Sequence, residues 1–134
     1  MTDAFKLPIR VYYEDTDAGG IVYHASYLRF GERGRTEMLR GAGFEHARLL
    51  KEEGLAFAVV ALNIEYKAPA QIDDLLMLHS RVTRMGGASI DIEQIFYRDD
   101  KIICEIKVVI VCIDQSMKAV RLPDKLRQLF KSET

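Results

Sequence analysis

The sequence predicts an α+β fold in which an antiparallel β-sheet wraps around one long central helix. One helical segment, residues 26–43, comes early, and four long strand-like runs follow it between residues 61 and 114. Consecutive strands joined by short turns form antiparallel sheets, and an amphipathic helix buries its apolar face against such a sheet. A chain of 134 residues without internal repeats or linkers is expected to form a single domain, residues 1–134.

The first strand is expected over IRVYYE, residues 9–14, where apolar or aromatic side chains alternate along the chain. This alternation places Tyr13 on the same face as Val11, so that the Tyr13 ring packs inward. A loop follows and leads directly into the long helix.

The helix is expected from about Ala25 to a stop at Gly41 and Gly43. One face of it carries a stripe of apolar and small residues at spacings of three and four. The stripe consists of Tyr27, Gly31, Gly34, Met38 and Gly41. An internal glycine costs about 1 kcal/mol relative to alanine, so we expect Gly31 and Gly34 to permit close approach to the sheet.

The remaining elements follow from alternation and turn residues. A short helix is expected at 46–53, and a closing amphipathic turn or short helix at 123–130. Strands are expected at 61–68, 75–84, 88–98 and 101–114, with turns at Gly86–Gly87 and Asp99–Asp100. A sheet of this kind leaves an exposed edge, so pairing with a second copy is expected.

Composition and charge narrow the classes of function. The formal net charge is −1 and 49% of residues are hydrophobic, which is typical of a soluble domain without a basic surface for nucleic acid. The first residues lack the apolar run of a secretory signal, and the longest apolar stretch is far shorter than the roughly 20 residues of a membrane span. We therefore expect a cytoplasmic protein. Cys104 and Cys112 are interpreted as small buried apolar residues.

The stretch YEDTDAGGIVYH, residues 13–24, gathers three carboxylates before a glycine pair and a histidine. A calcium loop that begins at Asp15 fails, because its twelfth position is Ser26 where a bidentate glutamate is required. A phosphatase-like Asp-x-Asp motif lacks a glycine loop that could hold phosphate. The sequence thus predicts no metal ion, and it leaves a solvated turn and an active site as the alternatives. Glu14 and Asp15 are expected to be solvated or to cap the turn.

The position of this stretch at the helix start favours an active site. The first N–H groups of a helix lack intrahelical partners and lie at the positive end of its dipole. The N–H groups of Tyr23 and His24 would polarise a carbonyl oxygen there, while the glycine pair lets the loop bring Asp17 to the same point. A carboxylate beside such donors suits acyl transfer from a reactive ester such as a thioester.

The segment RVYYEDTDAGGIVYHASYLRFGERGRTEML, residues 10–39, resembles the signature of the hotdog-fold acyl-CoA thioesterases of the 4-hydroxybenzoyl-CoA thioesterase family. It is most similar to the Tol–Pal-associated acyl-CoA thioesterases. IEYKAPAQIDDLL and VVIVCID extend the resemblance over nearly the whole chain. The resemblance implies a hotdog fold and hydrolysis of acyl-CoA to free acid and CoA, with no cofactor.

The resemblance also implies a role for each matching residue. Asp17 matches the catalytic carboxylate, acting as general base on water or as nucleophile. Tyr13 and His24 match a tyrosine and a histidine around that aspartate, and the backbone N–H at Tyr23–His24 matches the group that polarises the thioester carbonyl. The family's site lies at a dimer interface, and its members are commonly homotetramers built as pairs of dimers. Its ties to phospholipid synthesis imply acyl carrier protein and phospholipid-synthesis enzymes as partners.

Arg84 and Ser89 flank the expected turn at Gly86–Gly87 and are the candidate contacts of the CoA phosphates, with a solvated turn as the alternative. His46 and His79 have no visible partners and are expected to be structural. Two alternative functions stay open. One is a hotdog dehydratase acting on hydroxyacyl thioesters, which needs a histidine and a carboxylate at the substrate's α and β carbons. The other is a non-catalytic module that binds acyl carrier protein.

Overall fold

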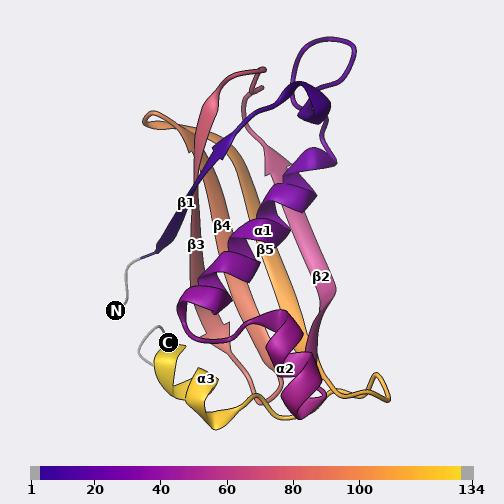
Figure 1. Cartoon of the computed structure of the whole chain (residues 1–134). Helices are drawn as coiled ribbons and strands as arrows, with labels where there is room; N and C mark the ends of the chain where they lie inside the picture. Colours follow the sequence, from indigo (N-terminus) through magenta and orange to yellow (C-terminus); the bar gives the residue numbers. More distant parts are fainter. Residues whose placement is uncertain (1–3, 131–134) are drawn as a thin grey trace.

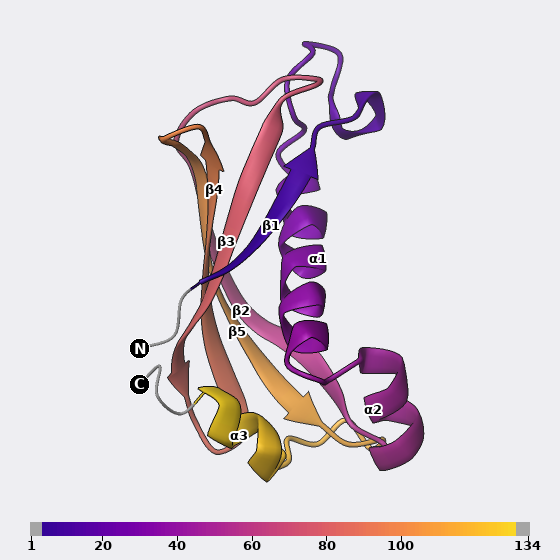
Figure 2. The same ribbon diagram turned by 60° about the vertical axis from the view of Figure 1, so that its left-hand side comes forward.

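The computed structural model describes residues 4–130, and it contains a curved five-stranded sheet with one long helix lying across its face (Figures 1 and 2). The strands are β1 (Phe5–Arg10), β2 (Ala56–Tyr66), β3 (Leu75–Met85), β4 (Ser89–Arg98) and β5 (Lys101–Ile113). The helices are α1 (Ser26–Gly41), α2 (His46–Glu53) and α3 (Asp124–Phe130), with a 3-10 turn at Tyr13–Asp15. The strand order is β1-β3-β4-β5-β2, and every neighbouring pair is antiparallel. The predicted α+β architecture is confirmed.

The glycine face of α1 lies against the centre of the sheet. This agrees with the expectation that the energetic cost of glycine inside a helix is offset by close packing. A Cβ atom on Gly34 would collide with the Leu78 side chain and would lie 3.0 Å from Nε2 of Gln94. A Cβ atom on Gly31 would lie 3.1 Å from Oε1 of the same glutamine. Gly41, the last residue of the predicted stripe, is instead exposed at the helix end.

Gln94 is fully buried at this contact and joins helix to sheet with hydrogen bonds. Its Nε2 donates to the Gly31 carbonyl oxygen and to Ser80 Oγ, both at 2.9 Å. Its Oε1 accepts a hydrogen bond from Arg35 Nη1 at 3.0 Å. A buried amide with all of these partners satisfied fixes one position of the helix on the sheet.

The expected first strand is wrong in its position. Strand β1 ends at Arg10, and the chain enters the 3-10 turn at Tyr13. Val11 is buried as expected, but the Tyr13 side chain is 81% exposed. The cause is the Asp15 carboxylate, which accepts the Tyr12 N–H at 2.8 Å and takes that donor away from a strand ladder.

Strand β2 begins at Ala56, earlier than the expected position 61, and a bulge between Val59 and Ala61 breaks its alternation. The other elements lie within a residue or two of their expected bounds. Cys104 and Cys112 are buried free cysteines, as predicted. No helix among residues 4–130 is both long enough and apolar enough to cross a membrane.

We predict that Gly34→Ala lowers the free energy of unfolding by about 1–3 kcal/mol, because overpacking outweighs the gain in helix propensity. The added methyl group must displace the fully buried Leu78 side chain or move α1 away from the sheet. Urea denaturation followed by circular dichroism measures this change.

Gly41→Ala is the matched control on the same helix face. Its Cβ atom would meet nothing closer than 3.7 Å, so stability should stay the same or rise by up to about 1 kcal/mol. Equal destabilisation by the two substitutions would contradict the close-contact interpretation of Gly34.

Candidate active site

The loop between the 3-10 turn and α1 lies at one end of the molecule, beyond the start of the helix (Figure 1). Thr16 and Val22 form an antiparallel bridge within it, and Ile21 forms another with Gln71. Gly20 has a φ of 79°, the left-handed conformation that glycine adopts at low cost. The loop is therefore a small closed turn held against the segment that precedes β3.

Asp17 occupies the first corner of this turn and is exposed to solvent. Its Oδ1 accepts the Gly19 N–H at 2.8 Å, and its backbone N–H donates to the Ile21 carbonyl oxygen at 2.9 Å. A Cβ atom on Gly19 would lie 3.3 Å from that Oδ1. Among residues 4–130 no hydrogen bond reaches the second oxygen, Oδ2, of Asp17. The hydrogen bond to Oδ1 thus orients the carboxylate, and Oδ2 is free to contact a substrate or a water molecule.

The two backbone donors predicted at the helix start differ in availability. The Tyr23 N–H donates to the Asp15 carbonyl oxygen at 2.9 Å, so it is not a free donor, contrary to the prediction. The His24 N–H donates to no acceptor in the described part of the chain. His24 therefore remains as the backbone group that can polarise a carbonyl oxygen beside the helix dipole.

The His24 side chain and carbonyl face aromatic neighbours. Its imidazole ring lies 4.5 Å from the Tyr23 ring and 6.4 Å from the Tyr66 ring, measured between centroids. The Tyr66 hydroxyl donates to the His24 carbonyl oxygen at 3.0 Å. Burial raises the pKa of Tyr66, so this hydroxyl stays protonated and able to donate at neutral pH. The contact fastens the end of β2 to the beginning of α1.

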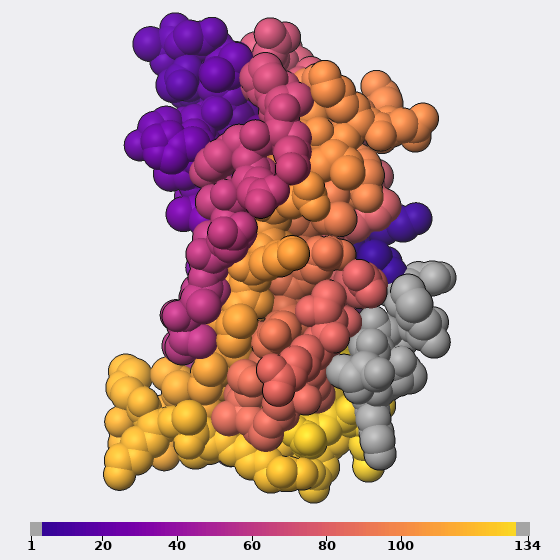
Figure 3. Space-filling model, turned by 180° about the vertical axis from the view of Figure 1, so that it is seen from behind, coloured from indigo at the N-terminus to yellow at the C-terminus, as the bar shows by residue number. Residues whose placement is uncertain are grey.

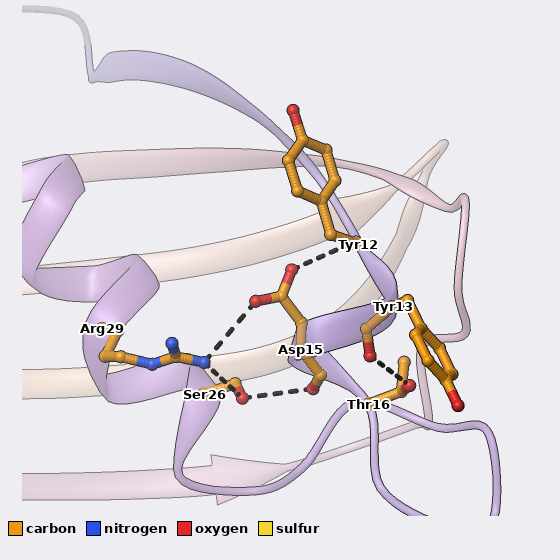
Figure 4. A network of polar contacts seen from close by, with 6 residues as sticks. All are labelled: Tyr12, Tyr13, Asp15, Thr16, Ser26 and Arg29. Atoms are coloured by element: carbon orange, nitrogen blue, oxygen red, sulfur yellow. Dashed lines mark hydrogen bonds and ion pairs between the residues drawn. The ribbon is translucent and has the colours of Figure 1, made fainter.

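Asp15 joins the 3-10 turn to the first turn of α1 (Figure 4). Its Oδ2 accepts the Tyr12 N–H at 2.8 Å, and its Oδ1 lies 3.5 Å from Nη2 of Arg29. Its carbonyl oxygen accepts the Ser26 hydroxyl at 3.2 Å in addition to the Tyr23 N–H.

The residue is only 4% exposed, so the expectation of a solvated Asp15 is wrong. Asp15 is also expected to cap the turn, and its hydrogen bond from the Tyr12 N–H is such a cap. Arg29 Nη2 also donates to Ser26 Oγ at 2.9 Å, which closes the network. A buried carboxylate needs such partners, because desolvation without them costs several kcal/mol. Asp15 is therefore a positioning residue for the loop that carries Asp17.

Tyr13 is not brought into this network by its side chain. Its ring points away from Asp15 into solvent, and only its carbonyl oxygen takes part, accepting the Thr16 hydroxyl at 2.8 Å (Figure 4). Within residues 4–130, no hydrogen bond or ion pair joins the Tyr13, Asp17 and His24 side chains to one another. One chain thus presents these three groups at one end without assembling them.

Arg84 and Ser89 lie at the other end of the sheet from Asp17. The loop touches the chain just before β3 begins, whereas Arg84 comes nine residues after the Leu75 start of that strand. At about 3.3 Å per residue this separates Arg84 from the loop by roughly 30 Å. The turn that they flank is held by α3, since Arg127 Nη1 donates to the Gly86 carbonyl oxygen at 2.6 Å. A single chain therefore does not bring these residues to the Asp17 loop.

Other nucleophilic side chains near the core are unreactive. Burial raises the pKa of the Cys104 thiol, and it also raises the pKa of the Tyr27 hydroxyl, so both stay protonated at neutral pH. The exposed Asp17 carboxylate therefore remains the candidate for chemistry beside the helix start.

Reasoning from the sequence missed four contributors to this site: Asp15 in its buried role, Ser26, Arg29 and Tyr66. The spacing of Ser26 and Arg29 on one helix turn was a usable signal for contact between them. No local pattern indicates that Tyr66 reaches a carbonyl oxygen 42 positions earlier in the chain.

Comparisons with known proteins agree with this fold. The family model described as the thioesterase-like superfamily matches residues 11–130. The chain is 45% identical to the acyl-CoA thioesterase YbgC of Haemophilus influenzae over 97% of this chain and 96% of that protein. It is 46% identical to the acyl-CoA thioester hydrolase YbgC of an Escherichia coli O6:H1 strain, over 97% and 98% of the two chains.

A solved structure gives the same result. The probable thioesterase from Bartonella henselae superposes with a TM-score of 0.84 at 41% identity, covering 88% of this chain and 98% of that one. The resemblance and the hotdog fold predicted from the sequence are confirmed. The protein is a thioesterase, and its chain belongs to the thioesterase-like superfamily.

Proposed function

We propose that the protein hydrolyses the thioester of acyl-CoA to free acid and CoA, with Asp17 as the catalytic carboxylate. The observation that carries the proposal is an exposed, oriented carboxylate on a loop that ends at the free His24 N–H. The substrate class is supported by relatives at 45% and 46% identity that are named for acyl-CoA.

The chemistry needs two groups from this chain. The His24 N–H binds the thioester carbonyl oxygen and stabilises the negative charge that develops there as the carbonyl carbon is attacked. Asp17 either removes a proton from the attacking water or attacks the carbonyl carbon itself. In both cases the C–S bond breaks and CoA leaves as its thiolate. Attack by water gives the free acid directly, whereas attack by Asp17 gives a mixed anhydride, which a water molecule then hydrolyses to release the acid and restore the Asp17 carboxylate. A dehydratase is less well supported, because His24 and Asp17 are not hydrogen-bonded to each other in the described chain.

We further propose that the enzyme is a homo-oligomer assembled through the edge of strand β2. Figure 3 shows β2 along one rim of the molecule, and residues of this strand expose large apolar side chains. These are Val59, Val60, Leu62 and Tyr66, exposed by 49%, 60%, 39% and 48%. The opposite edge, β1, is shorter and carries Pro8, which blocks strand addition.

Antiparallel pairing of two β2 strands supports a complete site. The Tyr66 end of β2 contacts the helix start through His24, whereas the Phe57 end lies beside α2. An antiparallel pair places unlike ends together, so the α2 end of one copy meets the Asp17 loop of the other. The turn with Arg84 and Ser89 lies at that same α2 end, where these residues are proposed to bind the CoA phosphates (Figure 2).

Replacing Asp17 with asparagine tests the mechanism. Asp17→Asn keeps an oxygen to accept the Gly19 N–H but removes the base or nucleophile, so kcat should fall about a hundredfold to ten-thousandfold. The release of free CoA from a panel of acyl-CoA substrates measures the loss. Wild-type turnover by Asp17→Asn, with the fold unchanged by circular dichroism, would refute the proposed role.

Replacing Asp15 with asparagine tests the positioning role. Asp15→Asn can still accept the Tyr12 N–H but loses the ion pair with Arg29, so the loop shifts. We expect kcat to fall about tenfold to a hundredfold, since small misplacements of reacting groups have effects of this size. KM should change little, because Asp15 is not expected to touch the substrate.

Glu14→Gln is the matched control for Asp15→Asn. Glu14 is the adjacent exposed carboxylate, and no hydrogen bond or ion pair of its side chain is found within residues 4–130. Its kcat should stay within about twofold of the wild type, in keeping with the small effects of exposed substitutions. An equal loss in both variants would mean that net charge, rather than the position of the loop, is what matters.

Replacing Val60 with lysine tests the interface. Two symmetry-related charges at a paired strand edge repel each other, so Val60→Lys should give monomers in light scattering and lose most activity. Leu129→Lys is the control, because Leu129 is also exposed, at 46%, but lies on α3 beside β1 and β3, at the opposite edge of the sheet from β2. An active monomeric Val60→Lys variant would contradict a site shared between two copies.

A further inference from the structure

A cavity of about 180 Å³ lies between α1, α2 and β2, away from the Asp17 loop. Polar side chains enter it from the two helices, and apolar side chains from the strands and α1 form its walls. Its polar members are Glu32, Arg35, Thr36 and His46, and its walls include Phe57 and Val59. Neither the fold nor the proposed catalytic step uses this cavity.

Arg35 is the unusual group in the cavity. The residue is only 7% exposed, yet no carboxylate lies within ion-pair distance of it among residues 4–130. A guanidinium carries five N–H groups, and the structure gives this one a single hydrogen bond, to the neutral Gln94 amide. Every fully buried side-chain nitrogen and oxygen in the described chain has a partner, so the remaining donors open into the cavity.

One carboxylate, that of Glu32, lines the cavity, but it forms no ion pair with Arg35. The His46 ring packs 6.0 Å from the Phe57 ring, and burial, followed by the positive charge of Arg40, lowers the pKa of His46. His46 is therefore neutral at pH 7 and can still donate one hydrogen bond. Glu32 is exposed to solvent, which screens its charge. A buried cation with a neutral partner and an open face is complementary to a carboxylate.

The distance between the cavity and the His24 N–H, which is proposed to bind the thioester carbonyl, indicates which copy's substrate can reach the cavity. Within one chain, Arg35 lies roughly 16 Å along the helix from His24, given the rise of 1.5 Å per residue. The β2 pairing proposed above instead places the α2 end of one copy beside the helix start of the other. The cavity then receives the far end of an acyl group whose thioester is held by the second copy.

We propose that the Arg35 cavity selects acyl groups that end in a carboxylate, so that the preferred substrates are monothioesters of dicarboxylic acids. This inference rests on the proposed thioesterase function and on the β2 pairing. A substrate that lacks the carboxylate leaves the guanidinium donors unpaired, and this lowers its kcat/KM relative to the matched dicarboxylic substrate.

The experiment compares substrates of equal length that differ at one end. In the wild type we expect glutaryl-CoA to be hydrolysed with a kcat/KM at least about tenfold above that of pentanoyl-CoA. Arg35→Met should bring the ratio close to one. The ratio is the readout, because Arg35→Met also removes the hydrogen bond to Gln94 and lowers turnover of both substrates. Glu32→Gln should raise the ratio, because it removes the remaining negative charge near the cavity.

Arg33→Met is the matched control, since Arg33 is an exposed arginine on the same helix and its loss should leave the ratio unchanged. Arg35→Lys covers the case in which Arg35→Met fails to fold, and it should keep part of the preference through its charge.

Absence of a glutaryl preference in the wild type would overturn the inference, as would a preference that survives Arg35→Met. If pentanoyl-CoA is cleaved without such a preference and cleavage still depends on Asp17, the proposed thioesterase function is supported and the proposed role of the Arg35 cavity is refuted. If no acyl-CoA is cleaved, the proposed function and the proposed role of the cavity are both refuted.

Discussion

The close contact between the glycine face of α1 and the sheet sets the geometry on which the rest of the structure depends. Gly31 and Gly34 let the helix approach until the buried Gln94 amide bonds to helix and strand together. A helix held this closely cannot slide or rotate without breaking buried hydrogen bonds, each of which then leaves an unsatisfied group. Its first turn is therefore fixed beside the end of β2, where Tyr66 bonds to His24.

Two aspartates separated by a single residue take opposite environments because of that fixed helix turn. Asp15 faces the helix and is surrounded by donors from Tyr12 and Arg29, which repay the cost of burying its charge. Asp17 lies on the far side of the turn and is exposed to water. The first holds the turn against the helix, and the second is the exposed carboxylate that we propose acts on the substrate. A reactive carboxylate on a loop needs such a neighbour, because exposed turns are otherwise the least ordered parts of a fold.

The sequence was sufficient for the fold because its signals are local. The three-and-four spacing of the α1 stripe and the period of two in β3, β4 and β5 each report which face is buried. Alternation failed at Tyr13, where the Asp15 carboxylate competes for the Tyr12 N–H, and at the start of β2, where a bulge interrupts the period. Neither the Asp15–Tyr12 hydrogen bond nor the bulge changes the alternation of apolar and polar residues in the sequence, so that alternation could not predict them.

The site was predictable only in part. Asp17 and His24 could be placed at a helix start because the motif and the helix adjoin in sequence. The burial of Asp15 could not, because it depends on Arg29 lying one turn into a helix whose direction is set by the sheet. In the same way the Arg35 cavity depends on Phe57 and His46, which reach it from β2 and α2.

Strand β2 links these parts, since one of its ends contacts the helix start and the other borders the cavity. A parallel pairing of two such strands would bring like ends together and leave both halves of the site apart. An antiparallel pairing about a two-fold axis joins unlike ends twice, so one interface completes two identical sites. In the proposed dimer, substrate selection and assembly are therefore properties of the same strand, so a change at the edge of β2 is expected to alter both.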